Sequence, residues 1–422
     1  MAFAWIFSTT FTILSSSRST SSIPDCCPWK LSKFQFRQSS RVVNCSCKSR
    51  LSAADELKYV LHDALDLSGI NTAHARAARR GFCLQIEKLS DIERETSISI
   101  NRKVDLGRAA LHIAAEDDSL VSHSSVPLPV DDFIERLDSL SMDYCSHYSS
   151  SCRSSPEKFL ECLERYLYVD KGFRRANARN QVEQRALYLN SVLTHRSGSV
   201  SMLSLIYSEI LKMLRMWDVL DFDVEIFFPH DSYSSPRGYQ KQKSKESDQP
   251  HIMTSQSLLV EILTDLKFAF WPFQLDHARS PFLTAAKAAQ GFTDSNSTKE
   301  SAFELASAKA ARHRLQRGVW TSVRFGDIRR ALSACERLIL LKTDPKELRD
   351  YAVLLYHCGF YEESLQYLKL YQDTKQQPDS TNDLEEDAVE KLIIRLNLIM
   401  MEEGWSRQPN NKGILFNNSE PW

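Results

Sequence analysis

The chain has 422 residues, of which 42% are hydrophobic and 25% are charged, with only 12 Gly and 14 Pro. This composition is typical of a globular, helix-rich protein that is long enough for two or three domains. The formal net charge of −1 excludes a globally basic nucleic-acid-binding protein, although it does not exclude a local basic patch. Beyond the first fifty residues, no apolar run approaches the roughly 20 residues that a membrane-spanning helix needs, so we expect a soluble protein.

The first fifty residues differ in composition from the rest of the chain. They contain twelve Ser and seven Lys or Arg, but a single acidic residue, Asp25. Such a Ser- and Arg-bearing, acid-poor stretch is typical of an organelle transit peptide. We therefore predict a transit peptide over residues 1–50 and import into the chloroplast stroma, because Ser outnumbers Arg. A mitochondrial destination is the alternative, and a secretory signal is disfavoured because Ser and Thr interrupt the apolar stretch Phe3–Leu14.

Apolar spacing predicts that most of the remaining chain is helical. Residues 51–105 are predicted to be a helical N-terminal region, and further helices are expected over Asp131–Tyr148 and from Pro156 onward. The segment DFDVEIFFP, Asp221–Pro229, is rich in Val, Ile and Phe and is the best strand candidate. Composition predicts three further segments: a mobile linker at 231–256, a connecting helical segment at 257–300 and a disordered tail at 406–422.

Six cysteines lie outside the predicted transit peptide, and none of them forms a CxxC pair. Four of them sit among apolar residues at helical spacing and are predicted to be buried free thiols: Cys83, Cys162, Cys335 and Cys358. A disulfide framework and a zinc site are therefore disfavoured. The sequence also lacks Walker, GxGxxG and HExxH motifs, so we predict no metal and no cofactor.

The C-terminal region, residues 301–405, reads as helical throughout and contains an internal repeat. Gly326 and Gly359 lie 33 residues apart, and the residues after them align in pairs: Ile328 with Tyr361, Ala331 with Ser364, Leu332 with Leu365, and Cys335 with Leu368. A Gly makes a tight turn, a bulky residue packs beneath it, and a small residue lets two helices approach. The pattern resembles the tetratricopeptide repeat and predicts a short stack of helical hairpins.

The stretch LNSVLTHRSGSVSMLSLIYSEILKML, Leu189–Leu214, predicts a buried helix that is entered through a Gly-Ser turn. In several hydrolase folds a nucleophile stands at such a turn. Ser199 and Ser201 are the nearest hydroxyls, and His195 precedes the turn. A Ser nucleophile would need a His within hydrogen-bond reach and an oxyanion hole. The simpler interpretation of Ser199 is that it caps the N-terminus of the helix.

Several motifs occur in the same order as in the bacterial SirB-type family, which has a transglutaminase-like domain followed by tetratricopeptide repeats. The similar segments are ALHIAAEDDSL (Ala110–Leu120), VDDFIERLDSLS (Val130–Ser141), LERYLYVDKGFRRA (Leu163–Ala176) and YLNSVLTHRSGSVSMLSLIYSEILKML (Tyr188–Leu214). The chain resembles this family over most of Leu106–Tyr371. The resemblance implies a mostly α (α+β) fold, with a transglutaminase-like domain at residues 106–230 and the repeats after it.

The resemblance also bears on catalysis. Active transglutaminase-like enzymes place a Cys at the head of the buried helix, and here that position falls at or beside Val200. No Cys lies between Cys162 and Cys335. His230 stands near the expected place of the family's His, but the Gly and the apolar strand beside it are missing. We therefore expect a vestigial pocket, with His195, Ser199, Val200, Ser201 and His230 as its candidate residues.

Together these features predict a non-catalytic, protein-binding scaffold, adaptor or assembly factor, and so a pseudo-enzyme. The predicted partner-binding groove lies in the repeats, at Arg324, Arg329, Arg330, Tyr356 and His357. The alternative is an amide-bond hydrolase or transferase that uses Ser199 or Ser201. A weaker alternative is an organelle RNA-associated protein, because residues 306–342 carry nine Lys or Arg against two acids. Without interleaved aromatic residues, nucleic acid is the less favoured partner.

Overall fold

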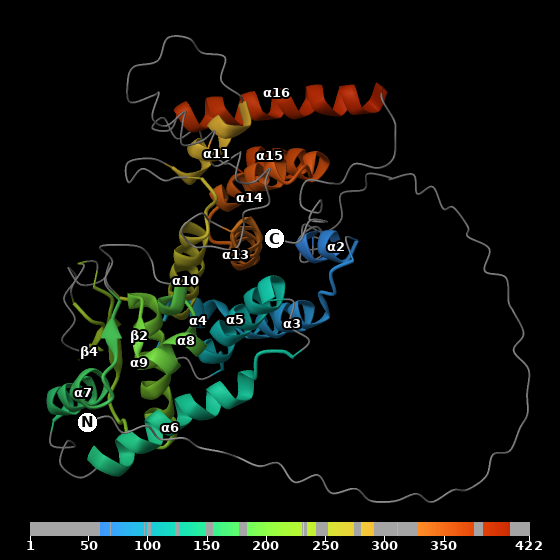
Figure 1. Ribbon diagram of the computed structural model, residues 1–422. Coiled ribbons are helices and arrows are strands. Elements are labelled where there is room, and N and C mark those ends of the chain that lie inside the picture. The colour runs from blue at the N-terminus through green and yellow to red at the C-terminus, as the bar shows by residue number, and fades with distance from the viewer. Residues whose placement is uncertain are drawn as a thin grey trace, which may run out of the picture. The chain divides into compact units, whose positions relative to one another are not determined.

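The computed structural model describes residues 60–67, 69–96, 98, 103–122, 126–148, 155–176, 184–229, 231, 234–241, 252–273, 280–290, 310, 327–374 and 383–405 (Figure 1). The fold is mostly α with small strand elements, as the sequence predicts. Residues 50–422 group into one compact unit. Within the described residues, no helix combines the length and the apolar character that crossing a membrane requires.

The main helices follow one another in chain order. They are α2 (Val60–Leu67), α3 (Ala73–Glu87), α4 (Asp91–Glu95), α5 (Leu106–Ser122), α6 (Val130–Tyr148), α7 (Pro156–Arg165), α8 (Leu189–His195), α9 (Val200–Met216), α10 (Ser255–Ala269), α11 (Pro281–Gln290), α13 (Ile328–Leu341), α14 (Lys346–His357), α15 (Tyr361–Thr374) and α16 (Asp383–Trp405). Local signals explain several of the starts. Ser155 accepts the Lys158 N–H ahead of Pro156 at the start of α7, and Thr254 accepts the Ser257 N–H at the start of α10.

The central helix is α9, which is buried on almost every side. Its buried residues include Leu205, Tyr207 and Ile210, each with no exposed surface. Helices α5, α6 and α10 pack against it, and α10 in turn packs against α13 (Figure 1). A helix that is apolar all round is stable only inside a core. The predicted buried helix after the Gly-Ser turn is therefore confirmed.

Two short pairs of strands accompany the helices. Strand β1 (Arg174–Arg175) pairs in parallel with β2 (Ser197–Gly198), immediately before α9. Strand β3 (Val224–Phe227) pairs antiparallel with β4 (Arg237–Gln240), with Val224 opposite Gln240. The predicted strand at Asp221–Pro229 is thus confirmed. The mobile linker predicted at 231–256 is wrong in part, because β4 and the bridge from Ile252 to Phe227 belong to this segment.

Helices α14 and α15 form a hairpin at the position that the repeat predicts. Gly359, at φ +82°, occupies the left-handed conformation in the turn between them. The Ser364 hydroxyl donates to the Ala352 carbonyl at 2.7 Å, so the small residue does allow close approach of the two helices. Helix α13 packs on α14, and α16 packs on α15 and α11 (Figure 1). Gly326, the turn of the preceding unit, lies outside the described residues.

A buried ion network joins the helices of the N-terminal region to those of the C-terminal region. Glu116 on α5 lies 2.6 Å from Arg79 on α3 and 3.1 Å from Arg337 on α13. Arg337 also pairs with Asp117 at 2.6 Å, and Arg79 pairs with Glu336 at 2.8 Å. Arg79, Glu116 and Arg337 have no exposed surface. Burial raises the pKa of Glu116, but Arg337 and Arg79 lower it further, so this carboxyl stays ionised.

Three of the four predicted buried free thiols are confirmed: Cys83, Cys335 and Cys358. Burial raises the pKa of the Cys335 thiol well above its ordinary value, so this sulfur stays protonated and unreactive. The prediction is wrong for Cys162, which is disulfide-bonded.

Candidate functional site

The candidate site lies where the chain turns into α9. Helix α8 ends at His195, and the next residue, Arg196, takes the left-handed conformation at φ 59°. The chain then passes through β2, where Ala176 N–H donates to the Gly198 carbonyl and Ser199 N–H donates to the Ala186 carbonyl. A Cβ atom on Gly198 would lie 2.8 Å from Val192 Cγ1, so only glycine fits this turn. The turn thereby fixes the position of the first residues of α9.

Ser199 caps α9, as the simpler interpretation of its hydroxyl predicts. Its side-chain oxygen accepts the Met202 N–H at 3.3 Å, at a backbone conformation typical of an N-cap. The same oxygen lies 2.7 Å from the Ser201 hydroxyl. Ser201 in turn donates to Asp265 Oδ2 on α10 at 2.6 Å. Because Ser201 has one proton and gives it to Asp265, Ser199 is the donor to Ser201.

Asp265 is the ionisable group at the end of this hydrogen-bond chain. Burial raises its pKa to about 6, and the neighbouring Glu261 adds to the rise. The Ser201 hydroxyl and the positive charge of Arg175 oppose the rise without cancelling it. Arg175, on β1, is held by the carbonyls of Asp231 and Ser234 at 2.5 and 2.8 Å. The site therefore contains a carboxyl group that titrates near neutral pH beside two hydroxyls.

The structure brings the candidate serines together but does not join them to a histidine within the described part of the chain. His195 is exposed at the C-terminal end of α8, and the hydrogen bonds of Ser199 and Ser201 go to each other, to Met202 and to Asp265. His230 lies outside the described residues. Val200 is buried, and Ser201 is 1% exposed, so only Ser199 presents its hydroxyl near the surface.

The predicted partner-binding groove is wrong for three of its residues, because they are buried. The Arg329 side chain donates to the Leu120 carbonyl at 3.2 Å, and the Arg330 guanidinium stacks 4.6 Å from the centre of the Phe270 ring. Tyr356 accepts from Arg395 Nε at 2.7 Å.

The remaining two groove residues have different outcomes. His357 is half-buried, with Nε2 at 2.9 Å from the Ala285 carbonyl and its ring against Phe273. Arg324 lies outside the described residues. The arginines of this region were predicted to be exposed, because the sequence does not show which carbonyls, carboxylates and aromatic rings their side chains contact in the folded protein.

The comparisons with known proteins identify one region. The sequence profile of the transglutaminase-like superfamily matches residues 131–217. Residues 131–217 are a transglutaminase-like domain. This domain spans α6 to α9 and contains His195, Ser199, Val200 and Ser201, whereas Asp265 lies beyond its end. No curated protein and no solved structure matches the chain.

Sequence reasoning did not find Asp265 or Arg175. Ser201, which donates its hydroxyl hydrogen to Asp265, lies 64 positions earlier in the sequence, so no local pattern indicates that the two side chains meet. Asp265 lies in a largely apolar helical segment, LLVEILTDLKFAF, whose other charged residues are Glu261 and Lys267, and a carboxyl group in such a segment is the signal that could have drawn attention to it. A carboxylate carried on a largely apolar helix needs a hydrogen-bond donor once it is buried.

Proposed function

We propose that the protein is a non-catalytic scaffold or assembly factor that binds partner proteins in the plastid. The observation that carries the proposal is the first turn of α9 in the transglutaminase-like domain. Val200 stands at or beside the position where active transglutaminase-like enzymes have their catalytic Cys. Ser199 serves as the helix cap, and Ser201 is buried and bonded to Asp265. The position of the nucleophile is therefore filled by groups that stabilise the helix.

The resemblance to SirB-type proteins with tetratricopeptide repeats supports the binding role. Helices α13 to α16 pack consecutively, and the α14–α15 hairpin has the small residue and the Gly turn of such a repeat. The buried network of Arg79, Glu116 and Arg337 fixes these helices to the rest of the unit. A partner would consequently meet a fixed surface rather than separately moving repeats.

An activity-directed experiment tests the absence of catalysis. The full chain is incubated with a fluorophosphonate hydroxyl probe, and labelled peptides are identified by mass spectrometry. We expect no labelling of Ser199 or Ser201 above that of the exposed Ser139, which serves as the internal reference. Labelling of Ser199 that Asp265→Asn abolishes would contradict the proposal and identify a hydrolase.

The binding role has its own experiment. Cross-linking of the full chain in plastid extract, followed by size-exclusion chromatography, should recover a stoichiometric complex. The complex should survive in Ser199→Gly, because glycine is also accepted at an N-cap and removes only the hydroxyl. If this variant lost the complex while keeping its thermal stability, binding would depend on the Ser199 hydroxyl. That result would refute a scaffold that binds its partner without using this hydroxyl.

One observation favours the amide-bond hydrolase or transferase as a second candidate. The chain of hydrogen bonds from Ser199 through Ser201 ends at a carboxyl whose pKa is about 6. In such a relay Ser199 would lose its proton to Ser201 as Ser201 passes its own to Asp265. A base with a pKa near the working pH is suited to this task. The relay would replace the His that the sequence-based alternative requires.

Plastid import is part of the proposal and rests on the composition of residues 1–50. A fusion of residues 1–50 to a fluorescent protein should accumulate in the stroma, and accumulation in mitochondria would select the alternative. The RNA-associated alternative is weakened because Arg329, Arg330 and Arg337 are buried. Salt-dependent binding of the full chain to single-stranded RNA would revive it.

A further inference from the structure

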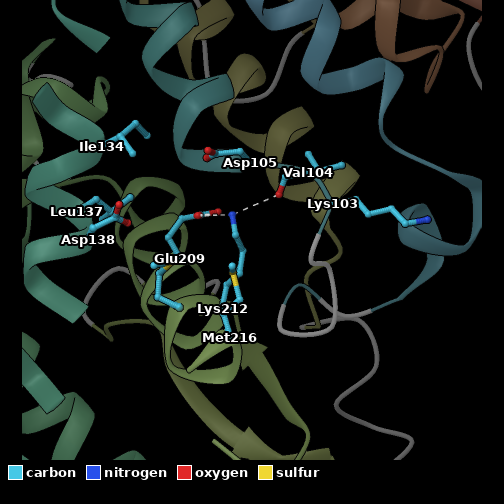
Figure 2. Close-up of a pocket in the computed structure, with 10 residues that line it drawn as sticks. Lys103, Val104, Asp105, Ile134, Leu137, Asp138, Glu209, Lys212 and Met216 are labelled. Carbon is cyan, nitrogen blue, oxygen red and sulfur yellow. Dashed lines mark hydrogen bonds and ion pairs between the residues drawn. The ribbon is translucent and has the colours of Figure 1, made fainter. Parts of the chain in front are cut away.

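A pocket lies at the end of α9 opposite to Ser199. It has a volume of about 290 Å³ and opens between the start of α5, helix α6 and the last two turns of α9 (Figure 2). Its wall combines apolar and charged side chains: Lys103, Val104, Asp105, Ile134, Leu137, Asp138, Glu209, Lys212, Met213 and Met216. At about 30 Å³ per water molecule, the pocket has the volume of about ten waters. It is therefore of a size for a small organic group.

Two charged groups of the pocket already neutralise each other. Lys212 Nζ lies 2.7 Å from Glu209 Oε2 and donates to the Val104 carbonyl at 3.4 Å, as Figure 2 shows. The side chain of Glu209 is 6% exposed. Asp105 accepts the Arg108 N–H at 2.8 Å at the start of α5, and its carboxylate lies 3.6 Å from the Arg108 guanidinium. These groups have their partners within the protein.

Asp138 on α6 is different, because its carboxylate has no hydrogen bond or ion pair to another described residue. Burial raises its pKa, and Asp105 raises it further, against the weaker opposing effects of Lys212 and Arg108. The amine of Lys103 points away from the pocket in Figure 2. Lys212 and Arg108 thus offset the charge of Asp138 only from a distance, and no described cation of the pocket pairs directly with its carboxylate.

The remaining lining limits which cation would fit. Ile134 and Leu137 on α6 and Met213 and Met216 on α9 form an apolar wall beside the carboxylate. Among the described residues, no group of three or more His, Cys, Asp or Glu could hold a metal ion. An apolar wall offers no oxygen ligands to a metal, but it favours the hydrocarbon part of an organic cation.

We propose that this pocket binds a small organic cation, an ammonium group on a short alkyl chain. The ammonium pairs with Asp138, and the alkyl chain lies against Met213, Met216 and Ile134. The inference goes beyond the proposed scaffold function and does not depend on it. The same chemistry is offered by a free alkylamine and by a lysine side chain of a partner protein.

A titration of the full chain followed by ligand-observed NMR tests the proposal. The probe is pentylammonium, and 1-pentanol is the neutral probe of matched shape. We expect pentylammonium to bind at least tenfold more tightly than 1-pentanol, because a hydrogen bond to an ionised group contributes more than one to a neutral group. A second titration with Nα-acetyl-lysine N-methylamide separates the two sources, since it binds only if the pocket also admits a side chain carried on a backbone.

Two isosteric variants complete the experiment. Asp138→Asn removes the charge of the unpaired carboxylate and should weaken pentylammonium binding about tenfold. Asp132→Asn removes an equal charge from an exposed position on the same helix, outside the pocket, and should leave binding unchanged. Both variants should retain the melting temperature of the original chain. Equal binding of the amine and the alcohol, or equal effects of the two variants, would overturn the proposal.

Discussion

Replacement of Asp265 by Asn should stabilise the protein at alkaline pH and leave its stability unchanged in acid. The carboxyl of Asp265 is buried and accepts a hydrogen bond from Ser201, which the amide oxygen of Asn can also accept. The substitution therefore keeps the shape and the hydrogen bond but removes the charge. Burial is the main cause of the raised pKa, because it makes the ionised carboxylate unfavourable in the folded protein. Asn carries no charge, so the substitution removes this free-energy cost of burial.

The magnitude follows from the pKa of Asp265, which rises from 3.8 to about 6. One pKa unit equals about 1.4 kcal/mol, so ionising this carboxyl in the folded protein costs about 3 kcal/mol at most. A raised pKa means that the folded state binds the proton more tightly than the unfolded state. The contribution of Asp265 to the free energy of unfolding is therefore fully present below pH 3.8, and it is lost as the pH rises through about 6.

Urea denaturation of the original chain and of Asp265→Asn, repeated from pH 4 to pH 8, measures this difference. The free energies of unfolding should converge near pH 4, and the variant should be more stable by about 1–3 kcal/mol at pH 8. Asp132→Asn, on the exposed side of α6, is the control and should show no such pH dependence. A difference that is constant with pH, or a variant that is less stable at pH 8, would refute the electrostatic reasoning.

Three further substitutions probe the packing that positions the site. Glu116→Gln should lower the free energy of unfolding by about 3–5 kcal/mol at neutral pH, because it removes a buried carboxylate that Arg79 and Arg337 share and leaves each arginine with one acidic partner. The effect should shrink below pH 4.5, since the pKa of Glu116 is lowered in the folded protein. The exposed-pair variant Arg94→Ala is the control and should cost under about 1 kcal/mol. Gly198→Ala should cost about 1–3 kcal/mol, and Val192→Ala in the same chain should recover part of this cost in a double-mutant cycle. Gly359→Ala should cost about 1 kcal/mol through backbone strain alone, because nothing lies within 4 Å of the added Cβ. Urea denaturation measures all three.

The sequence predicted what short-range patterns determine. The Gly-Ser turn before an apolar stretch correctly placed the cap at Ser199, and the alternation in DFDVEIFFP correctly placed β3. It missed β4, whose sequence RGYQ has no apolar alternation and becomes a strand only by pairing with β3. A short polar edge strand is defined by its neighbour and not by its own residues.

Long-range electrostatics accounts for the other misses. Arg329 and Arg330 were predicted to be exposed because charged side chains usually are, and only the folded chain shows the carbonyl and the ring that receive them. For Arg337, which is buried on the same helix, a signal was present in ALHIAAEDDSL, where its partners Glu116 and Asp117 interrupt an apolar helix. Adjacent acids on a buried segment require cations from elsewhere in the chain, and basic residues in the C-terminal helices supply them.

The ion network also bears on how the transglutaminase-like domain could act. Arg337 on α13 reaches Asp117 on α5, and Asp117 accepts from the hydroxyl of Tyr188, the residue immediately before α8. The C-terminal helices are thus connected through buried hydrogen bonds to the chain that leads into the candidate site. Such a network is stable only when every member is paired, so a displacement of α13 would leave charges unpaired beside that segment. Any displacement of α13 would consequently disturb the hydrogen-bonded connection from Arg337 through Asp117 to Tyr188, whereas a fixed α13 keeps this connection intact.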